Sequence, residues 1–171
     1  VLLRESLEDA DRTAALVTPD RDLARRVAME LRRWDISIDD SAGVPLSSTL
    51  SGSFVLLTVE MVCSGLTPIA LLSALKHPFS CGGLQKSDFR EIVRQLDLMI
   101  LRGPPPAPGF DGLQEAIKVA GDNFQEMFDL FALMEVKATP LINALSTENP
   151  SIGQLITAHI EFVEWLASDA D

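Results

Sequence analysis

The side chains that could do chemistry in this chain are few, and a Glu-x-Lys triplet is the most suggestive of them. Glu135-Val136-Lys137 matches the element of metal-dependent nucleases in which a carboxylate binds Mg²⁺ and a lysine assists the attacking water. That element needs a strand and a second carboxylate close by. Glu135 instead ends a helical pattern rich in Phe and Met, and Asp129 precedes it by about one and a half helical turns. We therefore interpret the triplet as a surface helix end rather than a nuclease site.

The two histidines are the other candidates for acid-base work. His159 lies at helical spacing between Leu155 and Val163, which is typical of a residue at the edge of a core. His77 follows Lys76 at the end of a predicted helix, where a positive side chain interacts favourably with the helix dipole. Neither histidine has a nucleophile, a metal or an orienting carboxylate in view, so we expect no catalytic histidine.

Neither a metal site nor a nucleotide-binding loop is predicted. Cys63 and Cys81 lack Cys-x-x-Cys spacing and a nearby His cluster, so two ordinary thiols are expected. A phosphate-binding loop would read Gly-x-x-x-x-Gly-Lys-Ser/Thr, and Gly82-Gly83 is not followed by Lys-Ser. Serine nucleophile elbows and His-Glu-x-x-His are absent as well. The sequence predicts no catalytic residue, no metal and no cofactor bound by this chain itself.

An arginine-rich segment from Asp20 to Trp34 is the strongest candidate contact surface. Apolar residues recur there at helical spacing, and five arginines fall on the opposite arc: Arg21, Arg25, Arg26, Arg32 and Arg33. Arginine binds phosphate oxygens in a bidentate manner. The same face could instead pair with Asp22, Glu30 or neighbouring domains. Our candidate DNA-binding residues are Arg21, Arg25, Arg32, Lys76, His77 and Arg102.

The charge distribution favours nucleic-acid contact in the first two thirds of the chain. The 171 residues carry a formal net charge of -11, which argues against a protein whose whole surface binds phosphates. Residues 1–102 hold 12 of the 14 basic residues against 14 acidic ones. Residues 103–171 hold only Lys118 and Lys137 against 11 acidic residues. The acidic excess therefore belongs to the C-terminal third.

The elements that would position these residues form a mostly α fold with a small N-terminal β-α-β unit. Thr13 to Thr18 is a short apolar run ended by Pro19, which predicts a buried strand, and residues 36–38 predict a second strand. With the arginine-rich helix between them, the strands should be parallel with a right-handed crossover. The chain then turns helical, and we expect helices over Phe54 to Cys63, Pro68 to Lys76, Lys86 to Leu101, Gly112 to Ala120, Phe124 to Val136 and Ser151 to Ala167.

A proline-rich stretch, RGPPPAPG at residues 102–109, predicts a rigid connector inside this helical part. We therefore divide the chain into residues 1–50, 51–102 and 103–171. No apolar run reaches the roughly 18 residues needed to cross a bilayer, and we expect a soluble, cytoplasmic protein without membrane contact. The first residue is Val1 rather than Met, which leads us to expect an internal piece of a longer protein.

Four segments together resemble the AddB family of double-strand-break repair proteins in its alphaproteobacterial form. They are TPDRDLARRVAMELRRW, DDSAG, LLSALKHPF and LRGPPPAPGFDGL, and the similarity extends over roughly residues 5–115. From about residue 120 onward nothing resembles that family beyond a helical continuation. This resemblance implies one of the two subunits of an ATP-dependent helicase-nuclease that resects broken DNA ends for recombination. Its partners would be DNA and the other helicase-nuclease subunit of the complex.

The resemblance also implies a fold and a division of labour. Residues 1–50 would begin the second RecA-like domain of a superfamily 1 helicase-like body. Residues 51–102 would start a helical insertion that interrupts this domain, and residues 103–171 would form its acidic helical continuation. The nuclease domain and the sites for ATP and Mg²⁺ would belong to the parent complex.

One position departs from the pattern of active helicases in that superfamily. Their first strand is followed by a turn with an arginine that reaches the γ-phosphate. Alignment on Arg26-Val27 places Asp20 there, and a slip of one residue would bring in Arg21. A carboxylate facing a phosphate is repulsive, so this position predicts a degenerate nucleotide motif. The leading hypothesis is a non-catalytic scaffold for the DNA channel and subunit interface, and the alternative is a protein-protein interaction module without DNA contact.

Overall fold

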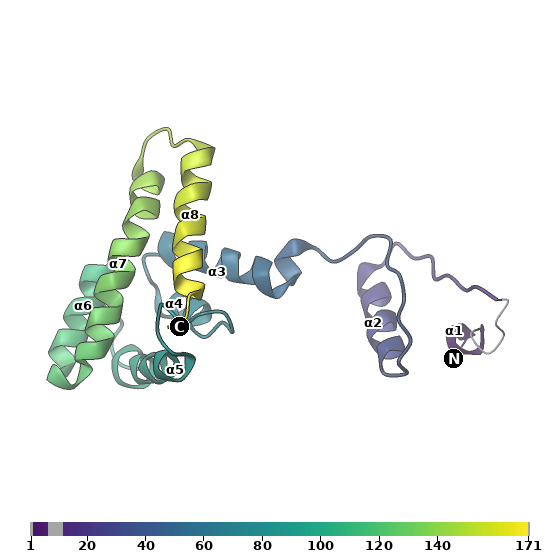
Figure 1. The fold of residues 1–171 in the computed structure, drawn as a ribbon, viewed down its shortest axis with the longest axis horizontal. Coiled ribbons are helices and arrows are strands. Elements are labelled where there is room, and N and C mark those ends of the chain that lie inside the picture. Colours follow the sequence, from purple (N-terminus) through teal and green to yellow (C-terminus); the bar gives the residue numbers. More distant parts are fainter. Residues whose placement is uncertain (1, 7–11, 171) are drawn as a thin grey trace. The chain divides into compact units, whose positions relative to one another are not determined.

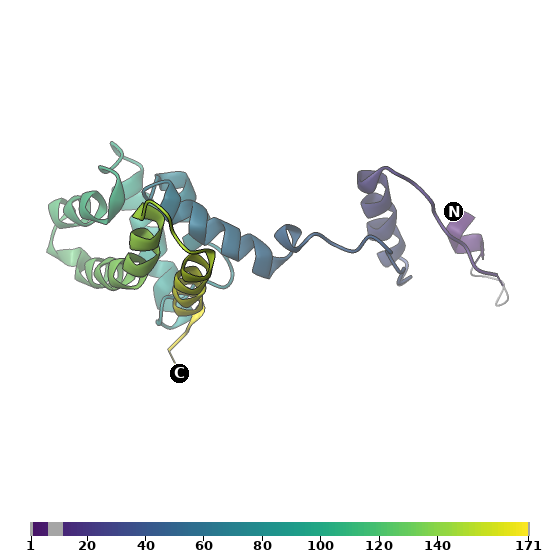
Figure 2. The same cartoon turned by 90° about the horizontal axis from the view of Figure 1, so that it is seen from above.

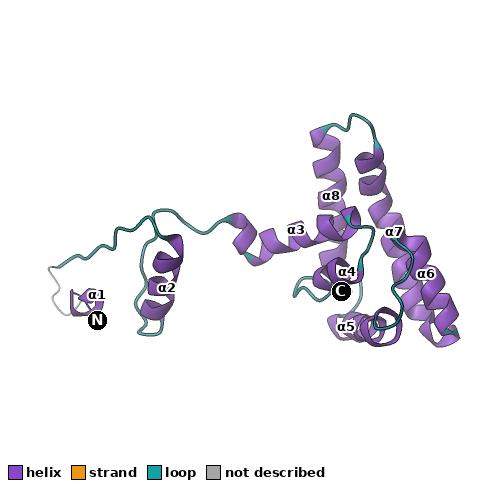
Figure 3. Ribbon diagram, turned by 180° about the vertical axis from the view of Figure 1, so that it is seen from behind, coloured by secondary structure: helices purple, strands orange, loops and turns teal. Residues whose placement is uncertain are grey.

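The structure is a computed structural model that describes residues 2–6 and 12–170, and the chain divides into two compact units. The first unit comprises residues 1–43 and the second residues 44–171. All regular elements of the described residues are helical, as Figure 3 shows by its colours. The expectation of a mostly α fold is therefore confirmed. Among the described residues, no helix combines the length and the apolar character required to cross a membrane.

The first unit contains α1 (Leu2–Ser6) and the expected arginine-rich helix, α2 (Arg21–Arg32). The carboxylate of Asp20 caps α2 by accepting hydrogen bonds from the backbone N–H groups of Asp22 at 2.9 Å and Leu23 at 3.0 Å. An N-cap aspartate satisfies donors that have no partner inside the helix and also favours the helix dipole. The start of α2 is thus fixed by local chemistry.

The two strands expected beside α2 are not present among the described residues. Residues 13–18 and 36–38 carry no strand, and the side chain of Val17 is 94% exposed instead of buried. An apolar run becomes a strand only when its backbone pairs with a neighbour, and two strands with one helix bury too little surface to be stable alone. These runs are apolar as predicted, but residues 2–6 and 12–43 of the first unit form no sheet with which the runs could pair.

The second unit is built, over its described residues, from six α-helices and three short segments of other helical types. Its α-helices are α3 (Leu50–Cys63), α4 (Pro68–Leu75), α5 (Lys86–Gln95), α6 (Gly109–Ala120), α7 (Gln125–Ser146) and α8 (Ile152–Ala167). The 3-10 segments are η1 (Leu46–Ser48) and η3 (Asp122–Phe124), and η2 (Leu96–Leu101) is π-helical. All six helices expected in this part of the sequence are present.

Helices on both sides of the proline-rich stretch share one core. The antiparallel pair α7 and α8 lies side by side in both ribbon views, and α6 packs along α7 (Figures 1 and 2). Fully buried large side chains come from all six of the helices: Met61, Leu71, Phe89, Ile117, Phe131, Met134 and Phe162. Burying one such side chain contributes about 1.5–3 kcal/mol, so this interior is the main source of stability in the unit.

The connector packs tightly against the helix that follows it. The backbone N–H of Gly109 donates to the carbonyl of Gly65 at 2.8 Å. A Cβ added at Gly112 would lie 2.0 Å from the carbonyl oxygen of Ala107, a distance that real Cβ atoms do not show. Gly112 is therefore required by the close approach of connector and helix.

Helix α7 is longer than expected because it continues through Pro140. A proline inside a helix removes one N–H donor and leaves the carbonyl four residues earlier without its partner. That carbonyl belongs to Val136, whose side chain is exposed, so water can satisfy it. The helix end expected near Val136 is consequently displaced to Ser146.

Candidate functional site

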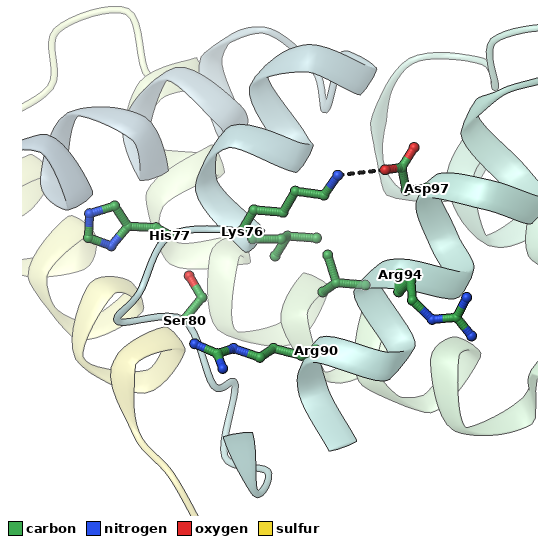
Figure 4. Close-up of a pocket in the computed structure, with 8 residues that line it drawn as sticks. Lys76, His77, Ser80, Arg90, Arg94 and Asp97 are labelled. Carbon is green, nitrogen blue, oxygen red and sulfur yellow. Dashed lines mark hydrogen bonds and ion pairs between the residues drawn. The ribbon is translucent and has the colours of Figure 1, made fainter. Parts of the chain in front are cut away.

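Two of the six candidate residues, Lys76 and His77, line one cleft of the second unit, and a third, Arg102, contacts the lining residue Asp97. The cleft lies between the end of α4 and the outer side of α5, with a volume of about 240 Å³. Its polar lining consists of Lys76, His77, Ser80, Arg90, Arg94 and Asp97, all labelled in Figure 4. Lys76 is the residue that ends α4, so its side chain leaves the helix where the backbone carbonyls are unpaired.

Asp97 contacts two candidate residues, Lys76 and Arg102, that are far apart in the sequence. Its Oδ2 lies 2.5 Å from the Nζ of Lys76, and its Oδ1 lies 3.5 Å from the Nε of Arg102. Asp97 and Arg102 are both positioned by the π-helical segment η2, which Arg102 terminates. The hydrogen bond from Lys76 is the main cause that holds the pKa of Asp97 below its ordinary value. Asp97 has no neighbour in the sequence that would indicate this role.

Helix α5 contributes a basic stripe that was not among the predicted contact surfaces. Lys86, Arg90 and Arg94 follow one another at intervals of four residues, and this spacing alone indicates one helical face. Arg94 forms two hydrogen bonds with Glu91, at 2.6 and 2.8 Å, and they lower the pKa of Glu91 to about 2. Arg90 has no carboxylate partner among the described residues and extends toward Ser80 (Figure 4).

His77 is held in one orientation by hydrogen bonds at both of its ring nitrogens. Its Nδ1 accepts a hydrogen bond from the backbone N–H of Phe79 at 3.3 Å and therefore carries no proton. Its Nε2 donates to the Oγ of Ser53 at 3.4 Å, because that hydroxyl gives its own proton to the carbonyl of Leu50. Burial lowers the pKa of His77 below its ordinary value.

An aromatic cluster lies directly beside the cleft. The ring of His77 stacks on Phe54, with centroids 4.9 Å apart, and meets Phe79 edge to face at 5.3 Å. Phe54 is buried, whereas 38% of Phe79 remains exposed. Two packed rings thus hold a third ring at the surface in a fixed orientation.

The arginine face of α2 is only partly available for binding. Arg21 forms a bidentate pair with Asp40, at 2.8 and 3.1 Å, and donates a further hydrogen bond to the carbonyl of Gly43. This hydrogen-bonded pair lowers the pKa of Asp40. Arg21 therefore ties the segment after α2 back onto the start of the helix, a structural role that the sequence did not reveal.

The other arginines of α2 are more accessible. Arg25 lies 3.7 Å from Asp22, and Arg33 lies 3.2 Å from Glu30, both as exposed pairs within one helix. Such pairs contribute at most about 0.5 kcal/mol and exchange readily with other anions. Neither Arg26 nor Arg32 has a carboxylate partner in the described part of the chain. The accessible cations of α2 are therefore Arg25, Arg26 and Arg32.

The Glu-x-Lys triplet lies in the middle of α7 rather than at a helix end. The Oε2 of Glu135 accepts a hydrogen bond from the Nε2 of Gln114 on α6 at 2.7 Å. Asp129 is engaged by Gln125 on its own helix. Within residues 2–6 and 12–170, no three His, Cys, Asp or Glu side chains come close enough to hold a metal ion. Both cysteines are free thiols, Cys63 exposed and Cys81 buried.

His159 lies at the edge of the core and joins α8 to α3. Its Nε2 is 3.0 Å from the Oγ1 of Thr58, a fully buried hydroxyl that donates to the carbonyl of Val55 at 2.8 Å. The hydroxyl proton is committed to Val55, so Nε2 of His159 is the donor. Burial is the main cause of the lowered pKa of His159.

Comparison with known proteins identifies no relative, because the chain matches no family model, no curated protein and no solved structure.

Proposed function

We propose that this chain is a non-catalytic, DNA-contacting part of a helicase-like subunit that acts in the repair of double-strand breaks. The observation that carries the proposal is the face of α2, where Arg25 and Arg32 are exposed and seven residues apart. Residues seven apart lie on one side of a helix, two turns from each other. Two guanidinium groups on one side can contact successive phosphates of one strand.

The apolar side of α2 supports the helicase-like part of the proposal. Residues 14–18, α2 and residues 36–41 line a groove of about 610 Å³ whose apolar walls include Leu16, Val27 and Ile38. Two extended apolar runs beside an amphipathic helix are what a strand-helix-strand unit provides before it joins a larger sheet. In this proposal residues 13–40 begin a RecA-like domain, and the runs pair with strands of the parent protein.

The cap of α2 supports a protein that does not hydrolyse ATP at this position. The N-terminus of a helix is a natural site for phosphate, because its N–H groups are unpaired and its dipole is positive. In this chain the carboxylate of Asp20 occupies those N–H groups. ATP and Mg²⁺ would then be used by the other helicase-nuclease subunit of the complex, and the chain's own contribution would be the DNA path and the subunit interface.

Salt-dependent binding of a fluorescent oligo-dT strand to the whole chain tests the proposal. The double variant Arg25→Ala/Arg32→Ala should bind about tenfold more weakly, and its slope of log affinity against log salt should fall by about 1.4. The matched control is Lys118→Ala/Lys137→Ala, which removes the same charge from the acidic part and should bind like the wild type. Absence of any binding at low salt contradicts the proposal.

A specific surface favours a second candidate, a protein-interaction module without DNA contact. Ile152, Ile156 and Ile160 are exposed along α8 at intervals of four residues, within the acidic third of the chain. A row of exposed isoleucines on one helical face is unusual for a surface in contact with water alone. If this candidate holds, the chain does not bind oligo-dT at low salt, and Ile156→Asp abolishes association with a protein partner.

A further inference from the structure

We propose that the cleft between α4 and α5 is a subsite for single-stranded DNA, in which Arg90 and Lys76 bind a backbone phosphate and Phe79 stacks on the adjacent base. This inference rests on the proposed DNA contact and assigns a second, separate place for it within residues 44–171. The residues concerned are assembled by tertiary packing, and they belong to a different unit from the arginines of α2.

The cleft is positively charged although the chain as a whole is acidic. Its lining includes three cations, Lys76, Arg90 and Arg94, and one anion, Asp97. The charge of Asp97 is already offset by Lys76 and, outside the lining, by Arg102, whereas Arg94 is paired with Glu91, which lies outside the lining. Arg90 remains without a carboxylate among the described residues, so its five N–H donors are available for an incoming phosphate.

The size of the cleft suits one phosphodiester group. Its volume of about 240 Å³ lies below the 300 Å³ or more typical of pockets for drug-sized molecules or nucleotide cofactors. A duplex contacts proteins over a wide surface, whereas a single strand can bend one backbone phosphate into a small recess. The dimensions of the cleft therefore suit a strand that passes across it better than they suit a ligand enclosed within it.

Phe79 supplies the second part of the recognition. Single-stranded nucleic acids bind where a positive groove lies next to aromatic rings, because unpaired bases stack on those rings. Phe79 meets the ring of His77, which itself lines the cleft, and keeps over a third of its surface exposed. The contacts of Phe79 with His77 and Phe54 fix the ring before a base arrives, which lowers the entropy cost of stacking.

The π-helical segment is a further observation that points to this place. A π-helical turn is less stable than α-helix, and such turns occur frequently at functional sites. Here it lies at the cleft, where η2 presents Asp97 to Lys76 and ends at Arg102. The π-helical turn thus fixes the position of Asp97, the side chain that orients Lys76.

The phosphate half of the proposal is tested with Arg90→Ala in the whole chain, measured by fluorescence anisotropy on labelled oligo-dT. We expect binding about three- to tenfold weaker and a salt slope lower by about 0.7, as for the loss of one phosphate contact. Lys86→Ala is the matched control, because Lys86 lies one turn earlier on the same helix and does not line the cleft. Equal losses for both variants overturn the proposal, since they would reflect net charge alone.

The stacking half is tested with Phe79→Ala and a strand that has abasic positions. On oligo-dT we expect affinity to fall about tenfold, since base-aromatic stacking is worth that order of magnitude. On the abasic strand Phe79→Ala should change nothing, whereas Arg90→Ala should still weaken binding. Phe79→Tyr keeps the ring and should bind normally. A loss for Phe79→Ala that persists on the abasic strand overturns the stacking contact.

The outcomes separate this inference from the proposed function. In one outcome the wild type binds oligo-dT and Arg25→Ala/Arg32→Ala weakens this binding, whereas Arg90→Ala and Phe79→Ala leave the binding unchanged. The proposed subsite is then wrong, and the proposed DNA contact of α2 stands. If the wild type binds no oligo-dT at low salt, both are wrong. Far-ultraviolet circular dichroism and Tm measurements check that each variant is folded. Ile69→Ala is the control for Phe79→Ala, because it also removes an exposed apolar side chain.

Discussion

Helices α2 and α5 carry the same kind of amphipathic pattern, yet the two units give them different surroundings. In α5 the apolar face is buried, with Phe89, Ile92 and Val93 in the core. In α2 only Leu31 is buried. Both helices present arginines on the opposite face. The difference teaches that an apolar stripe specifies a helix, whereas its burial depends on which other elements are there to cover it.

The two units consequently differ in what stabilises them. The second unit has a continuous interior assembled from α3 to α8. The first unit relies on local interactions, chiefly the Asp20 cap and the Arg21–Asp40 pair. A helix cap contributes about 1 kcal/mol and an exposed ion pair adds little, so local interactions of this kind amount to far less than a buried core. We expect this contrast to appear directly in the response of the chain to substitution.

The largest effect is expected from the interior of the second unit. Phe131→Ala removes a fully buried ring and should lower the free energy of unfolding by about 3–5 kcal/mol. Leu31→Ala, the corresponding truncation in the first unit, should leave the main urea transition unchanged. Equal losses from both substitutions, measured by circular dichroism in urea, would show that the two units unfold together and would remove the contrast.

An intermediate effect is expected at the cap of α2. Asp20→Ala should destabilise this helix by about 1 kcal/mol, because two backbone N–H groups lose their acceptor. Asp20→Asn keeps an acceptor oxygen and should retain the helix. Hydrogen exchange of the α2 amides measures both variants, and unchanged protection in Asp20→Ala would show that the first unit depends on more than local interactions.

The smallest effect is a pH dependence that belongs to the second unit. Burial depresses the pKa of His159, so below the ordinary value of about 6.5 the unfolded chain binds more protons than the folded one. Stability should be fully present above about pH 6.5 and decline as the pH falls through the folded pKa. His159→Gln should flatten the change in Tm between about pH 7 and 5.

Two other titratable groups have shifted pKa values and must be considered in this pH experiment. His77 has a pKa shift of the same sign, so His77→Gln should remove a further part of the decline. Glu91, with a pKa of about 2, loses its contribution only below its ordinary value of 4.5 and therefore lies outside the window. A steeper decline in His159→Gln than in the wild type would contradict the assigned sign.

Most helices could be predicted from sequence because their signals are local. Asp20 marks the start of α2, and Pro68 marks the first turn of α4, each through the geometry of a few residues. The site could be predicted only in part. Lys76, His77 and Arg102 were identified from their types, but Asp97 and Phe79 were not, because their roles depend on neighbours brought by the fold.

What the sequence determined by itself is the helical pattern, the arginine face of α2 and the separation of charge along the chain, since each depends on residue types at short spacing. Only the tertiary structure decided three further points: that Arg21 is tied to Asp40, that both ring nitrogens of His77 are hydrogen-bonded, and that Lys76 and Arg102 meet at Asp97. Hydrogen bonds and ion pairs require atoms to lie within a few ångströms, and for residues far apart in sequence that distance is set by packing.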